Sequence, residues 1–215
     1  MKNIWCIRHG TALHNELYKY IGTRAFTEFK DTHLTKKGHE ESINLGKTWD
    51  KIKDIEIVFV SPLTRTIQTA LNIFKNRDVK MIAIDEIMEH PQCLEVCNQR
   101  LDKKILIKQY PNIDFSRISD NHLLYWHDNF DNLNELERLK KRIEDFKKML
   151  EELSINPLDK IMPNNFEIVV AQFQKDYEIY NSELTRKKEA EIASYESYDI
   201  FEIEILDYLE NNEVY

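Results

Sequence analysis

The sequence is poor in glycine and in cysteine. Only 4 of its 215 residues are glycine, and none follows Gly46, so glycine-rich turns are excluded from the later four-fifths of the chain. The three cysteines are Cys6, Cys93 and Cys97. An odd and small number of cysteines argues against a disulfide framework and favours a reducing compartment.

Long apolar runs are also missing. No stretch approaches the roughly 20 apolar residues that a membrane-spanning helix needs, and residues 1–4 do not begin a signal peptide. We therefore expect a soluble, cytoplasmic protein with no membrane partner.

Basic residues are in deficit, because 30 Lys and Arg stand against 38 Asp and Glu, which gives a formal net charge of -8. A nucleic-acid-binding protein needs a basic surface to displace counterions, so no nucleic-acid partner is predicted. An anionic substrate must meet a local basic pocket.

A reactive cluster follows the first apolar run of the chain. Residues 4–7 are all apolar and predict a buried strand, and Arg8, His9 and Gly10 come directly after it. In open α/β sheets, ligands bind beyond the carboxyl ends of the strands. Arginine matches phosphate oxygens, histidine can act as a nucleophile, and glycine permits close backbone approach. The cluster favours phosphoryl chemistry, although an isolated Arg-His-Gly is a common tripeptide and a structural histidine is the alternative.

Two motifs in order strengthen this interpretation. Residues 8–15 read Arg-His-Gly-Thr-Ala-Leu-His-Asn, and residues 61–70 read Ser-Pro-Leu-Thr-Arg-Thr-Ile-Gln-Thr-Ala after a second apolar run. Both resemble motifs of the histidine phosphatase superfamily, the phosphoglycerate-mutase-like proteins. Residues 97–100 and 110–116 look like elements of the plant and fungal branch of that superfamily, which favours phosphatase over mutase.

The resemblance implies a mechanism and a set of residues. His9 would form a phosphohistidine, while Arg8, Asn15 and Arg65 would bind the oxygens of a small phosphorylated substrate. Neither a metal nor a cofactor is implied. A glutamate after the next strand would serve as general acid and base, for which Glu89 is our choice and Glu86 the reserve.

The expected fold is α/β, with a mostly parallel sheet, helices on both faces and phosphoglycerate-mutase-like topology. We interpret residues 1–215 as one domain, and no oligomeric state is predicted. Residues 16–30 are interpreted as a loop. A helix is expected after a Thr35 cap, and another is expected to begin after Pro62 with Arg65 in its first turn. The remaining expected elements are strands over 55–60 and 79–84 and a helix over 132–153 that opens with an Asn132–Glu135 capping box.

The resemblance ends in the C-terminal portion, residues 162–215, which is divergent. The family pattern requires a strand followed by a second histidine. Residues 166–171 predict such a strand, but Gln172 and Phe173 follow it, and all seven histidines lie at or before His127. The alternative function is therefore a catalytically weak or inactive relative that binds a phosphorylated ligand or a protein partner.

One further group of residues is of the types that bind metal ions. Cys93 and Cys97 are four residues apart, and His90 is close by in the chain. Because no second ligand pair follows at zinc-site spacing, no metal site is predicted.

Overall fold

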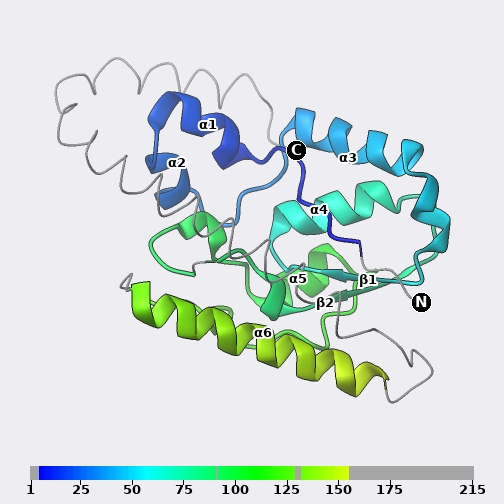
Figure 1. Ribbon diagram of the computed structural model, residues 1–215. Helices are drawn as coiled ribbons and strands as arrows, with labels where there is room; N and C mark the ends of the chain where they lie inside the picture. The colour runs from blue at the N-terminus through cyan, green and yellow to red at the C-terminus, as the bar shows by residue number, and fades with distance from the viewer. Residues whose placement is uncertain (1–4, 91, 129–131, 155–215) are drawn as a thin grey trace.

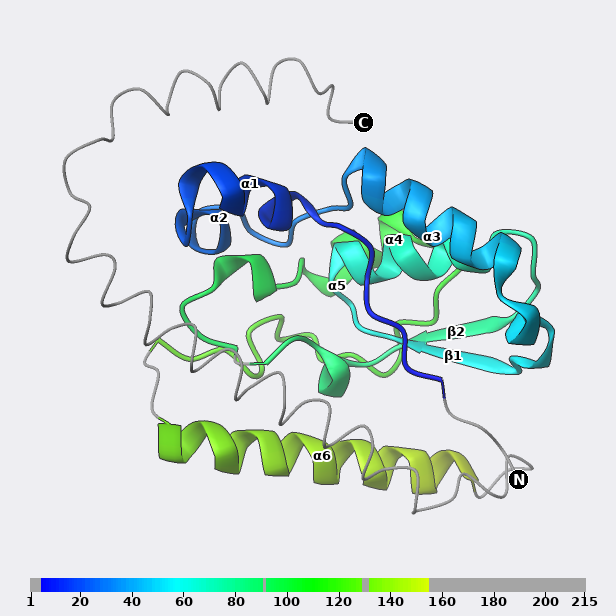
Figure 2. The ribbon, with the colours of Figure 1, turned by 45° about the horizontal axis from the view of Figure 1, so that its top comes forward.

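The computed structural model of the chain describes residues 5–90, 92–128 and 132–154 (Figure 1). Two parallel strands, β1 (Ile57–Val60) and β2 (Lys80–Ala83), form its sheet, with Ile57 opposite Lys80 and Val60 opposite Ala83. Figure 2 shows helices α3 (Lys36–Thr48) and α4 (Thr64–Ile73) on one side of this sheet and α6 (Asn132–Ser154) on the other. The predicted α/β class, with a parallel sheet and helices on both faces, is confirmed.

The two faces of the sheet bury different sets of side chains. Met81 and Ala83 of β2 face a core that contains Ile67 and Ile73 of α4. Ile82, on the opposite face, belongs to a second core. Its partners there include four side chains of α6: Ile143, Phe146, Met149 and Leu150. Alternate residues of a strand point to opposite faces, so this apolar strand is covered on both sides.

Short elements connect the layers. The structure contains α1 (Leu13–Ile21), α2 (Arg24–Thr27) and α5 (Lys103–Gln109), together with the 3-10 helices η1 (Asp50–Asp54), η2 (Asp85–Ile87) and η3 (Val96–Asn98).

Several predicted boundaries are confirmed. The predicted strands 55–60 and 79–84 contain β1 and β2, each shortened by one or two residues at an end. Thr35 caps α3 by accepting a hydrogen bond from the Gly38 amide at 3.2 Å, and Arg65 lies in the first turn of α4.

Two predictions near the N-terminus are wrong. Residues 5–7 form no strand, and Trp5 is exposed, with its ring edge-on to Trp49 at the end of α3. An apolar run becomes a strand only where another strand pairs with it, and neither β1 nor β2 does so. The expected loop over residues 16–30 contains most of α1 and all of α2, because the aromatic rings of Tyr18 and Phe26 pack together at 5.3 Å.

The helix predicted over 132–153 is confirmed as α6, which begins at Asn132 and ends at Ser154. The carboxylate of Glu135 lies 2.8 Å from Nε2 of His127 and 2.6 Å from the guanidinium of Arg138. The capping box between Asn132 and Glu135 stays a prediction. The divergent portion 162–215, including Gln172 and Phe173, lies outside the described residues.

Among the residues that the structure describes, no helix has both the length and the apolar character that a membrane crossing requires.

Two glycines bring the first motif against α3. A Cβ atom on Gly38 would lie 2.1 Å from the carbonyl oxygen of Thr11, and one on Gly10 would lie 2.5 Å from that of Gly38. Both obstacles are backbone atoms, which cannot swing away as a side chain can. The absence of a side chain at these two positions therefore sets the distance between residues 10–11 and the helix.

Gly38→Ala should lower the free energy of unfolding by about 1–3 kcal/mol, because the added methyl group overpacks this contact. Alanine in place of glycine stabilises an ordinary helix position by up to about 1 kcal/mol. The change in unfolding free energy expected for Gly38→Ala is therefore opposite in sign to the change that helix propensity alone would give. Urea denaturation of Gly38→Ala beside Lys37→Ala, an exposed change in the same turn, measures the effect. A Gly38→Ala protein as stable as wild type would contradict the close approach.

Candidate active site

His9 lies at the centre of the candidate site, between the first apolar run and α1. Its Nδ1 is 2.7 Å from the carbonyl oxygen of Gly10. A carbonyl can only accept, so Nδ1 carries the proton and Nε2 keeps its lone pair. Burial lowers the pKa of His9 to about 4, and the positive charges of Arg65 and Arg8 act in the same direction. The imidazole is therefore neutral near pH 7, as a nucleophile must be.

Arg65 is buried beside His9, with 1% of its side chain exposed. Its guanidinium donates to the carbonyl oxygen of Cys97 and to Oδ1 of Asn98, both at 2.8 Å. These bonds fix the plane of the guanidinium. Nε of Arg65 is also buried and makes no hydrogen bond within the described part of the chain, so one donor remains for a ligand.

The first and second motifs are joined by one hydrogen bond. The amide of Gly10 donates to Oγ1 of Thr69 at 3.0 Å, and the hydroxyl of Thr69 donates in turn to the carbonyl oxygen of Arg65 at 2.8 Å. The bond ties the backbone beside His9 to the helix that carries Arg65.

Glu89 is the carboxylate nearest to the buried arginine. Its Oε2 lies 3.7 Å from a terminal nitrogen of Arg65, and 48% of its side chain is exposed. Glu89 also raises the pKa of His9, which places its charge close to the imidazole. The side chain is near the reacting groups and still open to water.

Glu86, the reserve choice, lies elsewhere. Burial raises the pKa of Glu86, and the charges that act on it come from Asp85, Asp145 and Arg142. The latter two belong to α6, on the far side of the sheet from α4 (Figure 2). The geometry thus separates the two candidate acids and favours Glu89.

The model of the histidine phosphatase superfamily (branch 1) matches residues 4–112, which is just over half of the chain. The chain belongs to the histidine phosphatase superfamily. The resemblance of its two motifs is thereby confirmed.

Curated relatives come from a fungus and a plant. A protein named probable phosphoglycerate mutase from Arthroderma benhamiae is 24% identical over 126 residues, which cover 48% of this chain and 38% of that protein. A phosphoglycerate mutase-like protein from Arabidopsis thaliana is 26% identical over 156 residues, which cover 58% of each chain. The chain thus spans less than two-thirds of the length of either relative.

Among solved structures, the ecdysone phosphate phosphatase of Bombyx mori, in complex with tungstate, aligns with a TM-score of 0.39 and 17% identity, covering 61% of this chain and 51% of that one.

The other two predicted ligand-binding residues, Arg8 and Asn15, are not buried in the way that Arg65 is. Arg8 is exposed and close enough to His9 for its charge to lower the pKa of the imidazole. Asn15 lies in the first turn of α1, where its Oδ1 accepts from the amide of Ala12 at 2.9 Å. Phosphoryl oxygens need donors, so only the amide nitrogen of Asn15 is suited to bind them.

His14 was not singled out from the sequence, yet the structure places it beside His9. The two ring centroids are 6.1 Å apart, and Nδ1 of His14 is 2.5 Å from the hydroxyl of Thr32. Burial lowers the pKa of His14 to about 2, with the charge of Arg65 contributing. His14 is therefore neutral and buried beside His9; its place within the first motif, residues 8–15, was the available signal.

Two buried carboxylates hold the frame around these residues. Asp31 accepts from the amide and hydroxyl of Thr64 at 2.8 and 2.9 Å, and so caps the helix that carries Arg65. Asp85 pairs with the guanidinium of Arg100 at 2.7 Å, both being almost fully buried. The second pair anchors η2, just before Glu89, to the segment that follows Asn98.

Proposed function

We propose that this protein is a phosphatase that hydrolyses a small phosphate ester through a phosphohistidine at His9. The observation that carries the proposal is the hydrogen bond between Nδ1 of His9 and the carbonyl oxygen of Gly10 at 2.7 Å. It leaves Nε2 as an unprotonated nucleophile beside the buried side chain of Arg65.

In the first step, the lone pair of Nε2 forms a bond to phosphorus as the ester P–O bond breaks. The leaving oxygen keeps the electron pair of the broken P–O bond and takes a proton from Glu89. Glu89 lies 3.7 Å from Arg65, the arginine that would bind the phosphoryl group. In the second step, water attacks phosphorus, Glu89 accepts its proton, and the P–N bond breaks to free phosphate and His9.

The phosphoryl oxygens would be held by positive charge. The unpaired Nε of Arg65 supplies a buried donor, and Arg8 supplies a second charge near His9. Charge-assisted bonds of this kind strengthen as negative charge develops in the transition state. They form the local basic pocket that an anionic substrate needs on a chain of net charge -8.

Replacement of His9 by alanine tests the nucleophile. With an aryl phosphate and no added metal ion, wild type should release phosphate, and His9→Ala should lower kcat by more than about 10³-fold, as loss of a nucleophile typically does. His122→Ala, which changes a histidine of no assigned role, is the matched control and should retain wild-type turnover.

Activity that depends on added divalent cations and survives His9→Ala would contradict the proposed mechanism. Inhibition by inorganic phosphate with no turnover in wild type would instead support the alternative of an inactive relative that binds phosphorylated ligands. That alternative rests on the second histidine missing from its expected place after residues 166–171.

Glu89→Gln tests the general acid. It should slow hydrolysis of an alkyl phosphate by about 10²- to 10⁴-fold and that of a nitrophenyl phosphate far less in the first step, because only the poor leaving group needs a proton as its bond breaks. Burst kinetics isolate this step from dephosphorylation. Glu86→Gln is the matched control, and equal slowing of both substrates by Glu89→Gln would reject the assignment.

A further inference from the structure

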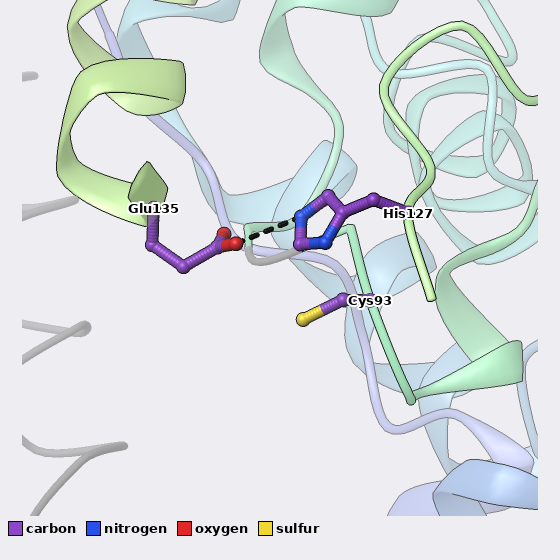
Figure 3. A group of neighbouring side chains, drawn as sticks. All are labelled: Cys93, His127 and Glu135. Atoms are coloured by element: carbon purple, nitrogen blue, oxygen red, sulfur yellow. Dashed lines mark ion pairs between the residues drawn. The ribbon is translucent and has the colours of Figure 1, made fainter. Parts of the chain in front are cut away.

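Three residues from separate parts of the chain meet beside the start of α6. The ligand atoms of Cys93, His127 and Glu135 all lie within 4.8 Å of one another. Figure 3 shows their side chains pointing toward a common space, with Glu135 and His127 joined by an ion pair of 2.8 Å. Nε2 of His90 lies 3.6 Å from the other carboxylate oxygen of Glu135.

The backbone holds two of these residues in register. Cys93 and His127 form an isolated parallel bridge, and the amide of His127 donates to the carbonyl oxygen of Gln92 at 3.0 Å. The third residue, Glu135, projects from the first turn of α6. The side chains are therefore brought together by a backbone bridge between two irregular segments and by the first turn of a helix.

Glu135 carries an unsatisfied buried oxygen. Its side chain is 0% exposed, and Oε2 makes no hydrogen bond within the described part of the chain. A buried carboxylate oxygen without a hydrogen-bonding partner is costly. Nothing in the proposed phosphatase mechanism uses this oxygen, whereas a cation between Glu135, His90 and Cys93 would satisfy it.

We propose that Cys93, His127 and Glu135 bind a zinc ion, with His90 as the fourth ligand. Thiolate, imidazole and carboxylate together are a zinc set, because hard cations such as Mg²⁺ and Ca²⁺ do not take sulfur. Ligand atoms around tetrahedral zinc are about 3.4–3.7 Å apart, as follows from its bond lengths. Shifts of about 1 Å would bring Cys93, His127 and Glu135, whose ligand atoms lie within 4.8 Å of one another, to these distances. His90 lies outside that group and would move further, exchanging the contact of its Nδ1 with Arg142, now at 3.5 Å, for a bond from Nε2 to the ion.

Arg138 is the competitor for this position. Its guanidinium lies 2.6 Å from Oε1 of Glu135 and 3.0 Å from Nε2 of His127, and thus occupies the place of a cation. Its side chain is 42% exposed, so it can turn into solvent when zinc binds. Two negative ligands, the thiolate and the carboxylate, then neutralise the charge of the ion.

The zinc would have a structural role. A site filled by four protein ligands has no position for substrate. It would fasten the start of α6 to His90 and Cys93, which follow the proposed acid Glu89 closely in the sequence. The proposal does not depend on the phosphatase activity, and the phosphohistidine mechanism makes no use of the ion.

Metal titration of the full chain tests the proposal. After removal of metal, the protein should take up one equivalent of zinc in competition with a chromophoric chelator. Cobalt(II) in its place should give a near-ultraviolet thiolate-to-metal charge-transfer band. Cys93→Ser should abolish that band, while Cys97→Ser, which removes another buried thiol four residues away, should retain it.

Arg138→Ala distinguishes a zinc site from a purely structural ion pair, because removal of the competing guanidinium should tighten zinc binding. His127→Ala, which removes a proposed ligand, should weaken zinc binding by more than about tenfold. Wild-type protein that takes up no stoichiometric zinc, or whose cobalt complex lacks thiolate ligation, overturns the proposal. This wild-type readout stands even if Cys93→Ser fails to fold.

Discussion

The buried guanidinium of Arg65 is the constraint on which the rest of this structure depends. A charge withdrawn from water must be met by acceptors held in place, and here they come from outside the helix that carries the arginine. The carbonyl oxygen of Cys97, the amide oxygen of Asn98 and, at 3.7 Å, the carboxylate of Glu89 surround it. Satisfying this one charge brings η3, the segment after β2, and α4 together.

The positive charge of Arg65 also affects the protonation of His9. Together with burial it keeps His9 neutral near pH 7. The buried Nε of Arg65 makes no hydrogen bond within the described residues, and in the proposed function that donor would serve a phosphoryl oxygen. The glycine contacts and the bond from Gly10 to Thr69 hold the His9 backbone against the helices. Structural and chemical requirements therefore meet in one buried arginine.

Features set by local signals could be predicted from the sequence. Thr35 caps α3, Arg65 begins α4, and the apolar runs before residues 61 and 85 are strands, because short-range patterns decide each of these. The strand expected at residues 4–7 failed, since a strand also needs a partner whose position no local pattern reveals. Likewise, α1 buries Leu17 and His14, and the ring of His14 packs on Phe26 of α2, a contact outside the sequence of α1.

The residues of the candidate sites also divide into those that a local motif predicts and those that only folding brings together. His9, Arg65 and Glu89 were predicted because their motifs resemble those of a family. The cluster of Cys93, His127 and Glu135 was missed, since its members are 34 and 8 residues apart in sequence and only folding joins them. From the sequence, Cys93 and Cys97 with His90 predicted no metal site, and the carbonyl oxygen of Cys97 accepts from Arg65. Spacing along the chain cannot show a site assembled from three separate segments.

The most direct test of the central claim is to locate the phosphoryl group on the protein. During turnover of an aryl phosphate, rapid quenching in alkali preserves phosphohistidine, and digestion with mass spectrometry identifies the modified residue. The account predicts phosphate on His9, with the Arg65→Lys protein trapping much less because lysine cannot keep the two bonds to Cys97 and Asn98 and also supply the Nε donor. Phosphate on any other residue, or turnover with no phosphoenzyme in pre-steady-state samples, would contradict it.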